Sequence, residues 1–406
     1  MKVLISGAGI AGLALAHVLA EGGHEVTVVE IAPTLRPGGQ LVDIRGTSRD
    51  AAERMGLLEP IRSAQLAQRG MRYVDDRGRT LAELGVEMFG GNGPVADLEI
   101  LRGDLTRVLH DVTATRVDLR FGDAIRTLDQ DDRGVDATFE HAPAERFDLV
   151  VAADGLHSRV RRLAWGPEAD YLHSLGGVTS FFDVPEPEPL DGWSLMDILP
   201  GRRMVLIRPD AAPGRAKAIL TWFGDHRLPH YRDVEAQKAL VRTGLADGVW
   251  HLPALVDALE TTTEFYFDSL VQVHMPELAR GRVVLLGDAG YCTSPLSGQG
   301  TALALIGAYL LGSELNRAAA AQSAVGPVAA FRAYEEAMVP HIAAGRELPP
   351  GSGSFATPKS RLGIRVLHAY IRASARPPLL TLVEKAMSSR HDVPLPDFDT
   401  VAVLDA

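Results

Sequence analysis

Gly7-Ala8-Gly9-Ile10-Ala11-Gly12 is the stretch of sequence that decides the fold. It follows a short apolar run at residues 2–6, which is typical of a buried parallel strand. An Ala- and Leu-rich run of helical length comes next, at residues 10–21, and a β-branched run occupies residues 25–30. The order strand, glycine turn, helix and strand predicts a βαβ unit at the start of an α/β domain.

Each glycine of this G-x-G-x-x-G pattern has its own task. The first allows the tight turn, the second lets the backbone approach a pyrophosphate, and the third lets helix and strand pack closely. The helix N-terminus offers N–H groups and a positive dipole end to the phosphates. Glu30, 18 residues after Gly12, can accept hydrogen bonds from a ribose diol and repels a 2′-phosphate. The pattern predicts a bound dinucleotide other than NADP, without choosing FAD over NAD; the alternative is a glycine turn without a ligand.

Composition narrows the class of protein. With 406 residues, the chain is long for one hydrophobic core, and we expect two domains. The formal net charge, 41 − 52 = −11, argues against nucleic acid as a partner. The single cysteine, Cys292, cannot form an intramolecular disulfide, so a reducing compartment is the default. The apolar residues 3–20 contain three glycines and fit a strand and helix better than a membrane span or export signal. We expect a cytoplasmic protein without a membrane partner.

Two kinds of pattern divide the rest of the chain. Residues 167–273 are rich in aromatics, prolines and short alternating runs, which indicate a mostly antiparallel sheet. The fold class is therefore α/β, with a Rossmann-like nucleotide-binding domain interleaved with a mostly antiparallel-sheet substrate domain, and with C-terminal helices. We assign residues 1–75, 98–166 and 274–350 to the first domain, 76–97 and 167–273 to the second, and 351–406 to a C-terminal helical segment. Individual elements are predicted as a hairpin at 71–84, strands at 117–121, 124–129, 135–139, 147–152 and 283–286, and helices at 48–55, 104–110, 301–316 and 360–388, the last interrupted at Pro377 and Pro378.

Two further segments carry ligand-binding patterns. Gly287-Asp288 follows the buried strand at 283–286, and Pro295-Leu296-Ser297-Gly298-Gln299-Gly300-Thr301 leads into a helix. There Asp288 can accept hydrogen bonds from a polyol, and the glycines let a flat ring lie against the main chain. The alternative is a helix cap and a connector. The segment Ala153-Asp154-Gly155-Leu156-His157-Ser158-Arg159-Val160-Arg161 either braces a cofactor or only caps a helix.

These three segments, in this order, resemble the fingerprints of the class A flavoprotein monooxygenases, which share the para-hydroxybenzoate hydroxylase fold. Residues 38–46 and 100–105 resemble segments of the tetracycline-inactivating monooxygenases and related actinobacterial polyketide hydroxylases, the most similar branch. The resemblance implies FAD as cofactor and a role in antibiotic biosynthesis or resistance. The residues that it and the glycine turn assign to the cofactor are Gly7, Gly9, Ile10, Ala11, Gly12, Glu30, Arg36, Gln40, Val42, Arg45, Arg102, Asp154, Gly287, Asp288, Pro295, Gly298, Gln299, Gly300 and Thr301.

The sequence departs from the family pattern at three positions. Tyr291 replaces the usual His of the G-D segment, and Thr301 replaces the usual Asn after the last glycine. Gly307 stands where the family often has an acid. These departures concern contacts around the flavin ring and leave the three fingerprints intact.

The chemistry that the resemblance implies belongs to the cofactor. NADPH or NADH reduces FAD, with Arg36 near the donor, and O2 then forms a flavin C4a-hydroperoxide that hydroxylates an aromatic or polyketide-like small molecule. The catalytic residue is unknown. The substrate-side candidates are Arg45, Met196, Arg203, Leu206, Trp222, Tyr291 and Pro295; for Arg203 the alternative is a solvated surface arginine, and for the apolar side chains it is plain core packing.

Other functions on the same fold stay open. These are a flavin-dependent oxidase, reductase or halogenase, or a flavin-binding protein without turnover. The halogenase is weakened because none of the four tryptophans belongs to a W-x-W-x-I motif. No metal is expected, since the 13 histidines show no H-E-x-x-H spacing. The expected partners are a small aromatic substrate and O2, with the chain a monomer or weak homodimer.

Overall fold

The structure is a computed structural model that describes residues 1–36, 38–89, 96, 98–321, 327–348, 356–374 and 393–398. Its first layer is a six-stranded sheet in the order β17-β18-β11-β1-β2-β7, parallel except for β17 at the edge. The strands are β1 (Lys2–Ser6), β2 (Glu25–Glu30), β7 (Asp118–Phe121), β11 (Leu149–Ala152), β17 (Ala279–Arg280) and β18 (Val283–Leu285). The predicted βαβ unit is confirmed, since β1 and β2 are parallel neighbours joined by α1 (Ile10–Glu21).

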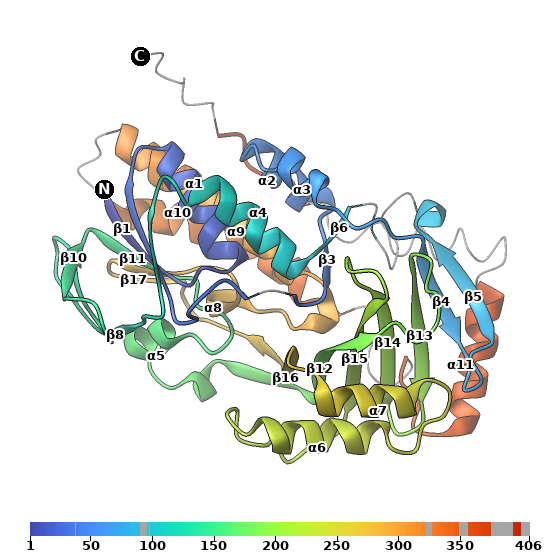
Figure 1. The fold of residues 1–406 in the computed structure, drawn as a ribbon. Coiled ribbons are helices and arrows are strands. Elements are labelled where there is room, and N and C mark those ends of the chain that lie inside the picture. The colour runs from blue at the N-terminus through green and yellow to red at the C-terminus, as the bar shows by residue number, and fades with distance from the viewer. Residues whose placement is uncertain are drawn as a thin grey trace.

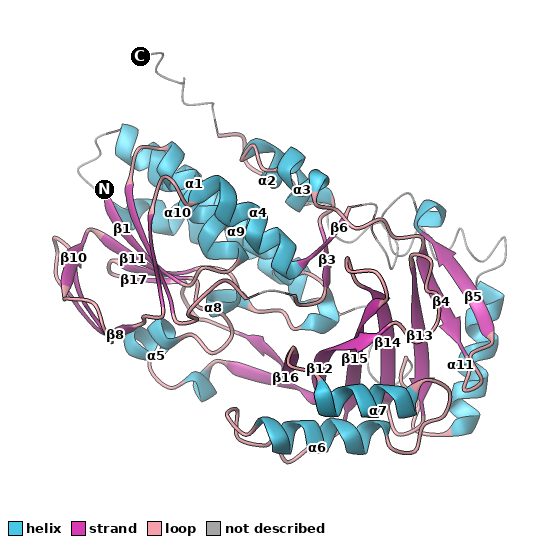
Figure 2. Ribbon diagram, viewed as in Figure 1, coloured by secondary structure: helices cyan, strands magenta, loops and turns pink. Residues whose placement is uncertain are grey.

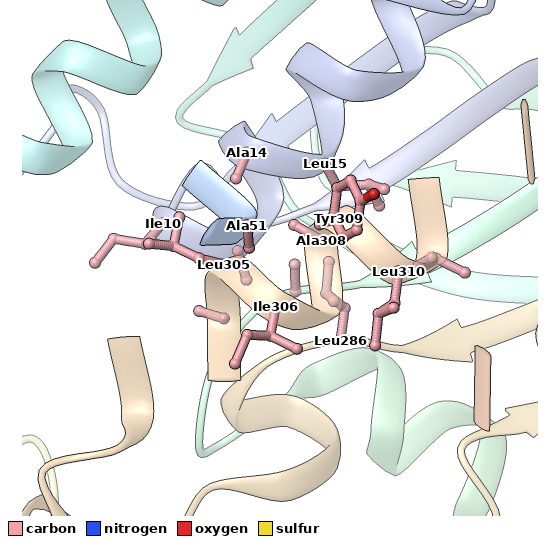
Figure 3. Packing of buried hydrophobic residues seen from close by; sticks show 14 of the residues in the cluster. Ile10, Ala14, Leu15, Ala51, Leu286, Leu305, Ile306, Ala308, Tyr309 and Leu310 are labelled. Carbon is pink, nitrogen blue, oxygen red and sulfur yellow. The ribbon is translucent and has the colours of Figure 1, made fainter. Parts of the chain in front are cut away.

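Helices cover this sheet and form the largest core of the molecule (Figures 1 and 2). Side chains of α1 pack against those of α9, with Ala51 of α2 beside them (Figure 3). The approach of α1 and α9 is close, because a Cβ added to Gly312 would lie 2.5 Å from Cγ1 of Val18. The helices in and around this layer are α2 (Gly46–Arg54), α3 (Leu58–Ser63), α4 (Arg102–Thr113), α5 (Arg159–Trp165), α8 (Asp288–Tyr291), α9 (Gly300–Ala320) and α10 (Pro327–Arg346).

A seven-stranded sheet forms the second part of the molecule. Its order is β16-β12-β15-β14-β13-β4-β5, antiparallel except where β13 and β4 run parallel. The strands are β4 (Gly70–Val74), β5 (Thr80–Gly85), β12 (Leu172–Pro185), β13 (Trp193–Leu199), β14 (Arg203–Pro209), β15 (Arg215–Phe223) and β16 (Phe265–Val273). The predicted hairpin is confirmed as β4–β5. Because β4 pairs with β13, the sheet begins at Gly70, before the predicted boundary at residue 75.

Helices cover both faces of this sheet. The sequence does not predict those on one face and predicts the helix on the other face in part. One face is covered by α6 (Val234–Leu245) and α7 (Leu252–Thr261), two helices inside the region predicted as sheet. The other face packs against α11 (Arg361–Ser374), which confirms the first part of the predicted helix at 360–388. Residues 375–388, and most of the predicted C-terminal segment 351–406, lie outside the described residues.

Two small sheets complete the fold. One contains β8 (Ile125–Gln130), β9 (Val135–Phe139) and β10 (Glu145–Phe147), and the other pairs β3 (Leu41–Asp43) with β6 (Glu99–Leu101). Short 3₁₀ turns lie at η1 (Val86–Phe89), η2 (Glu168–Asp170) and η3 (Pro295–Ser297). Within the described part of the chain, no helix combines the length and the apolar character that a membrane crossing requires.

Candidate functional site

The three glycines of the turn between β1 and α1 have different surroundings: two are needed for close backbone packing, and one borders open space. Gly7 has a φ of +107°, and a Cβ there would collide with the carbonyl of Ala153. A Cβ at Gly12 would collide with the carbonyl oxygen of Gly7. A Cβ at Gly9, by contrast, would meet only Nη2 of Arg102, at 3.9 Å. Since no side chain caps α1 at Gly9, the N–H groups of its first turn face this space.

Glu30 is fixed at the edge of the same turn. Its Oε2 accepts a hydrogen bond from the backbone N–H of Ala8, and its Oε1 accepts one from Ala32, both at 2.9 Å. Each carboxylate oxygen keeps a further lone pair. Glu30 is therefore oriented to accept from an additional donor, such as a ribose hydroxyl.

Arg102 and Asp288 extend the site away from the turn. Arg102 begins α4, and its backbone N–H donates to the carbonyl of Gln40 at 3.0 Å. Asp288 begins α8, and its side chain is exposed, yet the surrounding protein desolvates it enough to raise its pKa, which the nearby Arg102 opposes. Oδ1 of Asp288 is also 3.8 Å from the position of a Cβ on Gly300. The structure thus brings together Gly9, Arg102, Asp288 and the start of α9.

The loop at residues 38–46 is attached to the start of α4. Besides the Gln40 carbonyl, the Gly38 carbonyl accepts a hydrogen bond, 2.7 Å long, from the N–H of Gly103. Val42 follows on β3, opposite Ile100 of β6. Arg36 is exposed, whereas Arg45 forms an ion pair with Asp43 and occupies the N-cap position of α2, where its backbone is hydrogen-bonded to the Ser48 hydroxyl. Gln40 and Val42 therefore lie on a segment held beside Arg102, and the Arg45 guanidinium is engaged locally.

The segment before α9 presents a second helix N-terminus. Pro295 is exposed and begins η3, and Gly298 adopts the left-handed conformation at φ +69°. No side chain caps α9 at Gln299, whose own N–H donates to Oγ of Ser297 at 3.1 Å. Gly287, with φ +65°, leads into α8, and a Cβ there would lie 2.9 Å from that of Ala11. The G-D segment is thus packed directly against the glycine turn.

Asp154 serves the helix that follows it. Its carboxylate accepts hydrogen bonds from the hydroxyl of Ser158 and from the N–H groups of Arg159, at 2.8 Å, and Val160, at 3.1 Å. The fully buried Arg161 then donates to the carbonyl of Ala289 at 2.8 Å. The Asp154 contacts fit the capped helix start, one of the two interpretations of this segment, and Arg161 ties the segment to α8.

The substrate-side candidates separate onto two faces of the large sheet. Met196 and Leu206 lie on the face that packs against Ile364 and Leu367 of α11. On that same face, Arg208 forms an ion pair of 2.5 Å with Glu99 of β6. Lys217 of β15, opposite Arg208 in the sheet, has its Nζ 3.3 Å from a Cβ placed on Gly38. The face with Met196 and Leu206 is therefore the one that meets the cofactor loops.

Arg203 and Trp222 lie on the opposite face. The Arg203 guanidinium is paired with Asp247 and donates to the carbonyl of Gly244 at 2.9 Å. The interpretation of Arg203 as a solvated surface arginine is wrong, since the residue is only 7% exposed. Trp222 packs against α6, and its ring lies tilted against that of His226, with the centroids 4.3 Å apart. Both side chains support α6, and neither faces Met196.

Tyr291 is buried in the core of the nucleotide-binding domain and not at a substrate face. Its hydroxyl hydrogen bonds with that of Tyr334 at 3.1 Å. A Cβ at Gly307 would collide with this hydroxyl, so the missing side chain at 307 provides the room that the tyrosine occupies. The two departures from the family pattern, at 291 and 307, therefore compensate each other: the glycine leaves the room that the larger tyrosine side chain needs.

Two aromatic side chains at the site were not singled out from the sequence. The rings of Phe181 and Tyr266 lie 5.4 Å apart on the paired strands β12 and β16. Tyr266 is close enough to Asp288 for that charge to affect its pKa. Only the strand register reveals this placement, because nothing within 20 residues links Tyr266 to the fingerprints. In the described part of the chain, no group of three or more His, Cys, Asp or Glu side chains is arranged to hold a metal ion.

Comparisons with known proteins agree with this geometry. Residues 1–340 match the family model described as FAD binding domain. The chain is 42% identical over 318 residues to an uncharacterised protein of Mycobacterium tuberculosis, covering 78% of this chain and 85% of that protein. It is 36% identical over 345 residues to a flavin-dependent monooxygenase of an unknown prokaryotic organism, covering 85% and 87%. It is also similar to the crystal structure of the tetracycline destructase Tet(55), with 32% identity, a TM-score of 0.79 and 98% of each chain covered. The chain therefore belongs to the FAD binding domain family and is one of its flavin-dependent monooxygenases.

Proposed function

We propose that the protein hydroxylates an aromatic or polyketide-like small molecule, with O2 as co-substrate and NADPH or NADH as electron donor. The observation that carries this proposal is the meeting of Gly9, Arg102 and Asp288 between the uncapped N-termini of α1 and α9. Bound FAD supplies the redox chemistry, since it takes up the donor's electrons and activates O2.

The residues present fit FAD at this site. The space that a Cβ at Gly9 would fill, facing Arg102, suits a pyrophosphate. Glu30, held by the N–H groups of Ala8 and Ala32, would accept from a ribose hydroxyl, and the exposed Asp288 would accept from a polyol chain. We propose that Ile10, Ala11 and Gly12 donate through the start of α1, that Gln40 and Val42 contact the cofactor through backbone, and that Gly287 and the segment Pro295 to Thr301 support the ring.

The proposed substrate face is the apolar face of the large sheet that meets the cofactor loops. Met196 and Leu206 form part of an apolar cluster closed by α11, and Phe181 lies on the same face, opposite Ile219 of β15. Such a surface would exclude water from the substrate and leave its orientation to a few polar groups. The likeness to a tetracycline destructase supports a polycyclic substrate. We propose Arg36 as a contact of the nicotinamide donor, because it is exposed beside the Gly38 loop.

The decisive experiment follows oxygen into the product. Purified protein should contain FAD and should oxidise NADPH faster when a substrate is added from a panel of tetracyclines, anthraquinones and phenols. Under ¹⁸O2, mass spectrometry should find one labelled oxygen in the product. Hydrogen peroxide without an oxygenated product would point to an oxidase, and flavin that no nicotinamide donor reduces would point to a binding protein without turnover.

Asp288→Asn tests the assignment of the polyol contact. Asparagine keeps the size but replaces one carboxylate oxygen, an acceptor, with an amide donor, and it removes the charge opposite Arg102. We expect FAD affinity to fall by roughly 10- to 100-fold, the loss of one to two charge-assisted hydrogen bonds. Fluorescence titration of apoprotein with FAD measures it, and Asp225→Asn, an exposed aspartate on another part of the sheet domain, is the control. If FAD affinity is unchanged in Asp288→Asn, Asp288 does not contact the polyol and only begins α8.

We further propose a cytoplasmic location and a monomeric or weakly dimeric state. Light scattering after size-exclusion chromatography tests the latter.

A further inference from the structure

A chain of hydrogen-bonded titratable side chains crosses from the nucleotide-binding domain to the large sheet. His157 lies between β11 and α5, and its Nε2 is 3.1 Å from Oδ2 of Asp268 on β16. Its Nδ1 is 3.3 Å from the carboxylate of Glu168 in η2. On the other side of Asp268, the hydroxyl of Tyr266 donates to the same Oδ2 at 3.1 Å. Asp268 thus receives one partner from each domain.

The sheet end of this chain lies at the cofactor site. Burial, followed by the charges of Asp268 and Asp288, raises the pKa of Tyr266 well above its ordinary value. Tyr266 therefore stays protonated, and its hydroxyl donates to Asp268. Tyr266 is 45% exposed, and its ring lies tilted beside Phe181 on the face that meets the cofactor loops. The orientation of Tyr266 thus depends on Asp268.

We propose that His157 is a positioning residue, which as an imidazolium holds Asp268 and, through it, the Tyr266 hydroxyl at the edge of the FAD site. This inference rests on the proposed function, because it takes the space beside Asp288 to be the FAD site. The sequence alone places His157 in the D-G segment, while its partner stands 111 residues away on the sheet. Neither the fingerprints nor the mode of FAD binding requires this pair.

The carboxylates nearest to His157 favour a protonated ring, and the neighbouring cations are paired with one of these carboxylates. Asp268 faces it from β16 and Glu168 from η2, with Tyr266 behind Asp268. The cations Arg161 and Arg162 of α5 both lie near Glu168, at 3.7 Å and 3.3 Å, and Arg162 also donates to the His157 carbonyl. The hydrogen bond to Asp268 is the largest influence and raises the pKa of His157 above the ordinary value, although desolvation opposes it.

The sign of the pH dependence follows from this shift. A histidine whose pKa is raised by folding contributes fully below its unfolded pKa, about 6.5. The contribution is lost as pH rises through the higher pKa of the folded state. The link between the two domains is therefore strongest in mildly acidic solution and weak in alkaline solution.

The first test uses apoprotein and needs no turnover. Ring ¹⁵N NMR of His157 should give a pKa above that of an unstructured histidine, and Asp268→Asn should lower it. His251, which pairs with Glu188 at 3.0 Å elsewhere in the sheet domain, is the matched reference ring. A His157 pKa that does not respond to Asp268→Asn would overturn the proposal.

The second test measures FAD affinity between pH 6 and pH 9. His157→Gln, which keeps a hydrogen-bond donor without the charge, should weaken FAD binding roughly 3- to 10-fold at pH 6 and hardly at pH 9. Tyr266→Phe should show the same loss at low pH, whereas His251→Gln should match the wild type throughout. Equal losses at every pH would indicate a merely structural role and contradict the proposal. If the wild-type protein binds no FAD at any pH, the proposed function fails instead, while the NMR titration still decides on the His157–Asp268 pair.

Discussion

Gly9→Ala should give a folded protein that no longer retains FAD. The added methyl group meets no protein atom nearer than Nη2 of Arg102, at 3.9 Å, and the φ of −81° suits alanine. We therefore expect the fold of Gly9→Ala to be the same as that of the wild type. The same methyl group occupies the space in front of the first turn of α1, where the pyrophosphate must approach the backbone. We expect affinity for FAD to fall by at least about 100-fold, which corresponds to ~3 kcal/mol of lost binding free energy.

The neighbouring glycines provide the matched controls for this variant. Gly12→Ala would drive its methyl group into the carbonyl oxygen of Gly7, and Gly7→Ala would do the same at Ala153 while also straining a backbone with φ +107°. Both should lower the thermal midpoint of the apoprotein, since a loss of 1 kcal/mol shifts it by roughly 1 °C in a chain of this size. Gly9→Ala should keep the wild-type midpoint of the apoprotein. If the Gly9→Ala protein is yellow and has full FAD content, the glycine turn does not bind FAD and the assignment is wrong.

Local chemistry explains why the start of the chain could be predicted from sequence. The predicted runs at 10–21 and 25–30 coincide with α1 and β2, because a glycine turn between a β-branched strand and an Ala-rich helix leaves few other conformations. Arg102 and Asp288 converge on Gly9 because each stands at the start of a helix that follows a buried strand.

The large sheet shows where such prediction ends. In β14 and β15 a shift of one residue moves a side chain to the opposite face, so Trp222 supports α6 while its neighbour Thr221 faces the other way with Ile219. Nothing in the local sequence distinguishes the two faces, because both are buried. Likewise, α6 and α7 interrupt a region whose aromatics and prolines suggest strands, and their stability comes from packing on the sheet. The Asp268 partner of His157 also depends on tertiary register.

The pair Tyr291 and Gly307 offers a second strong prediction, because its two members depend on each other. Gly307→Ala alone places a methyl group against the Tyr291 hydroxyl and 3.0 Å from Cδ1 of Leu286, in a core that cannot expand cheaply. We expect a loss of about 1–3 kcal/mol in the free energy of unfolding. This would appear although alanine favours a helix over glycine by up to about 1 kcal/mol.

Removing the hydroxyl should relieve that conflict. Tyr291→Phe alone should cost about 0.5–1.5 kcal/mol, since Tyr334 loses one partner but still donates to the carbonyl of Leu285 at 3.1 Å. The double variant should then be more stable than the sum of the single losses by at least about 1 kcal/mol, as measured by urea unfolding of the apoproteins. Additive losses would mean that the side chains at 291 and 307 relax independently. A favourable coupling would show that the tyrosine in the G-D segment is tolerated because the helix opposite it lacks a side chain, so that the two departures from the family pattern preserve one packing arrangement beneath the FAD site.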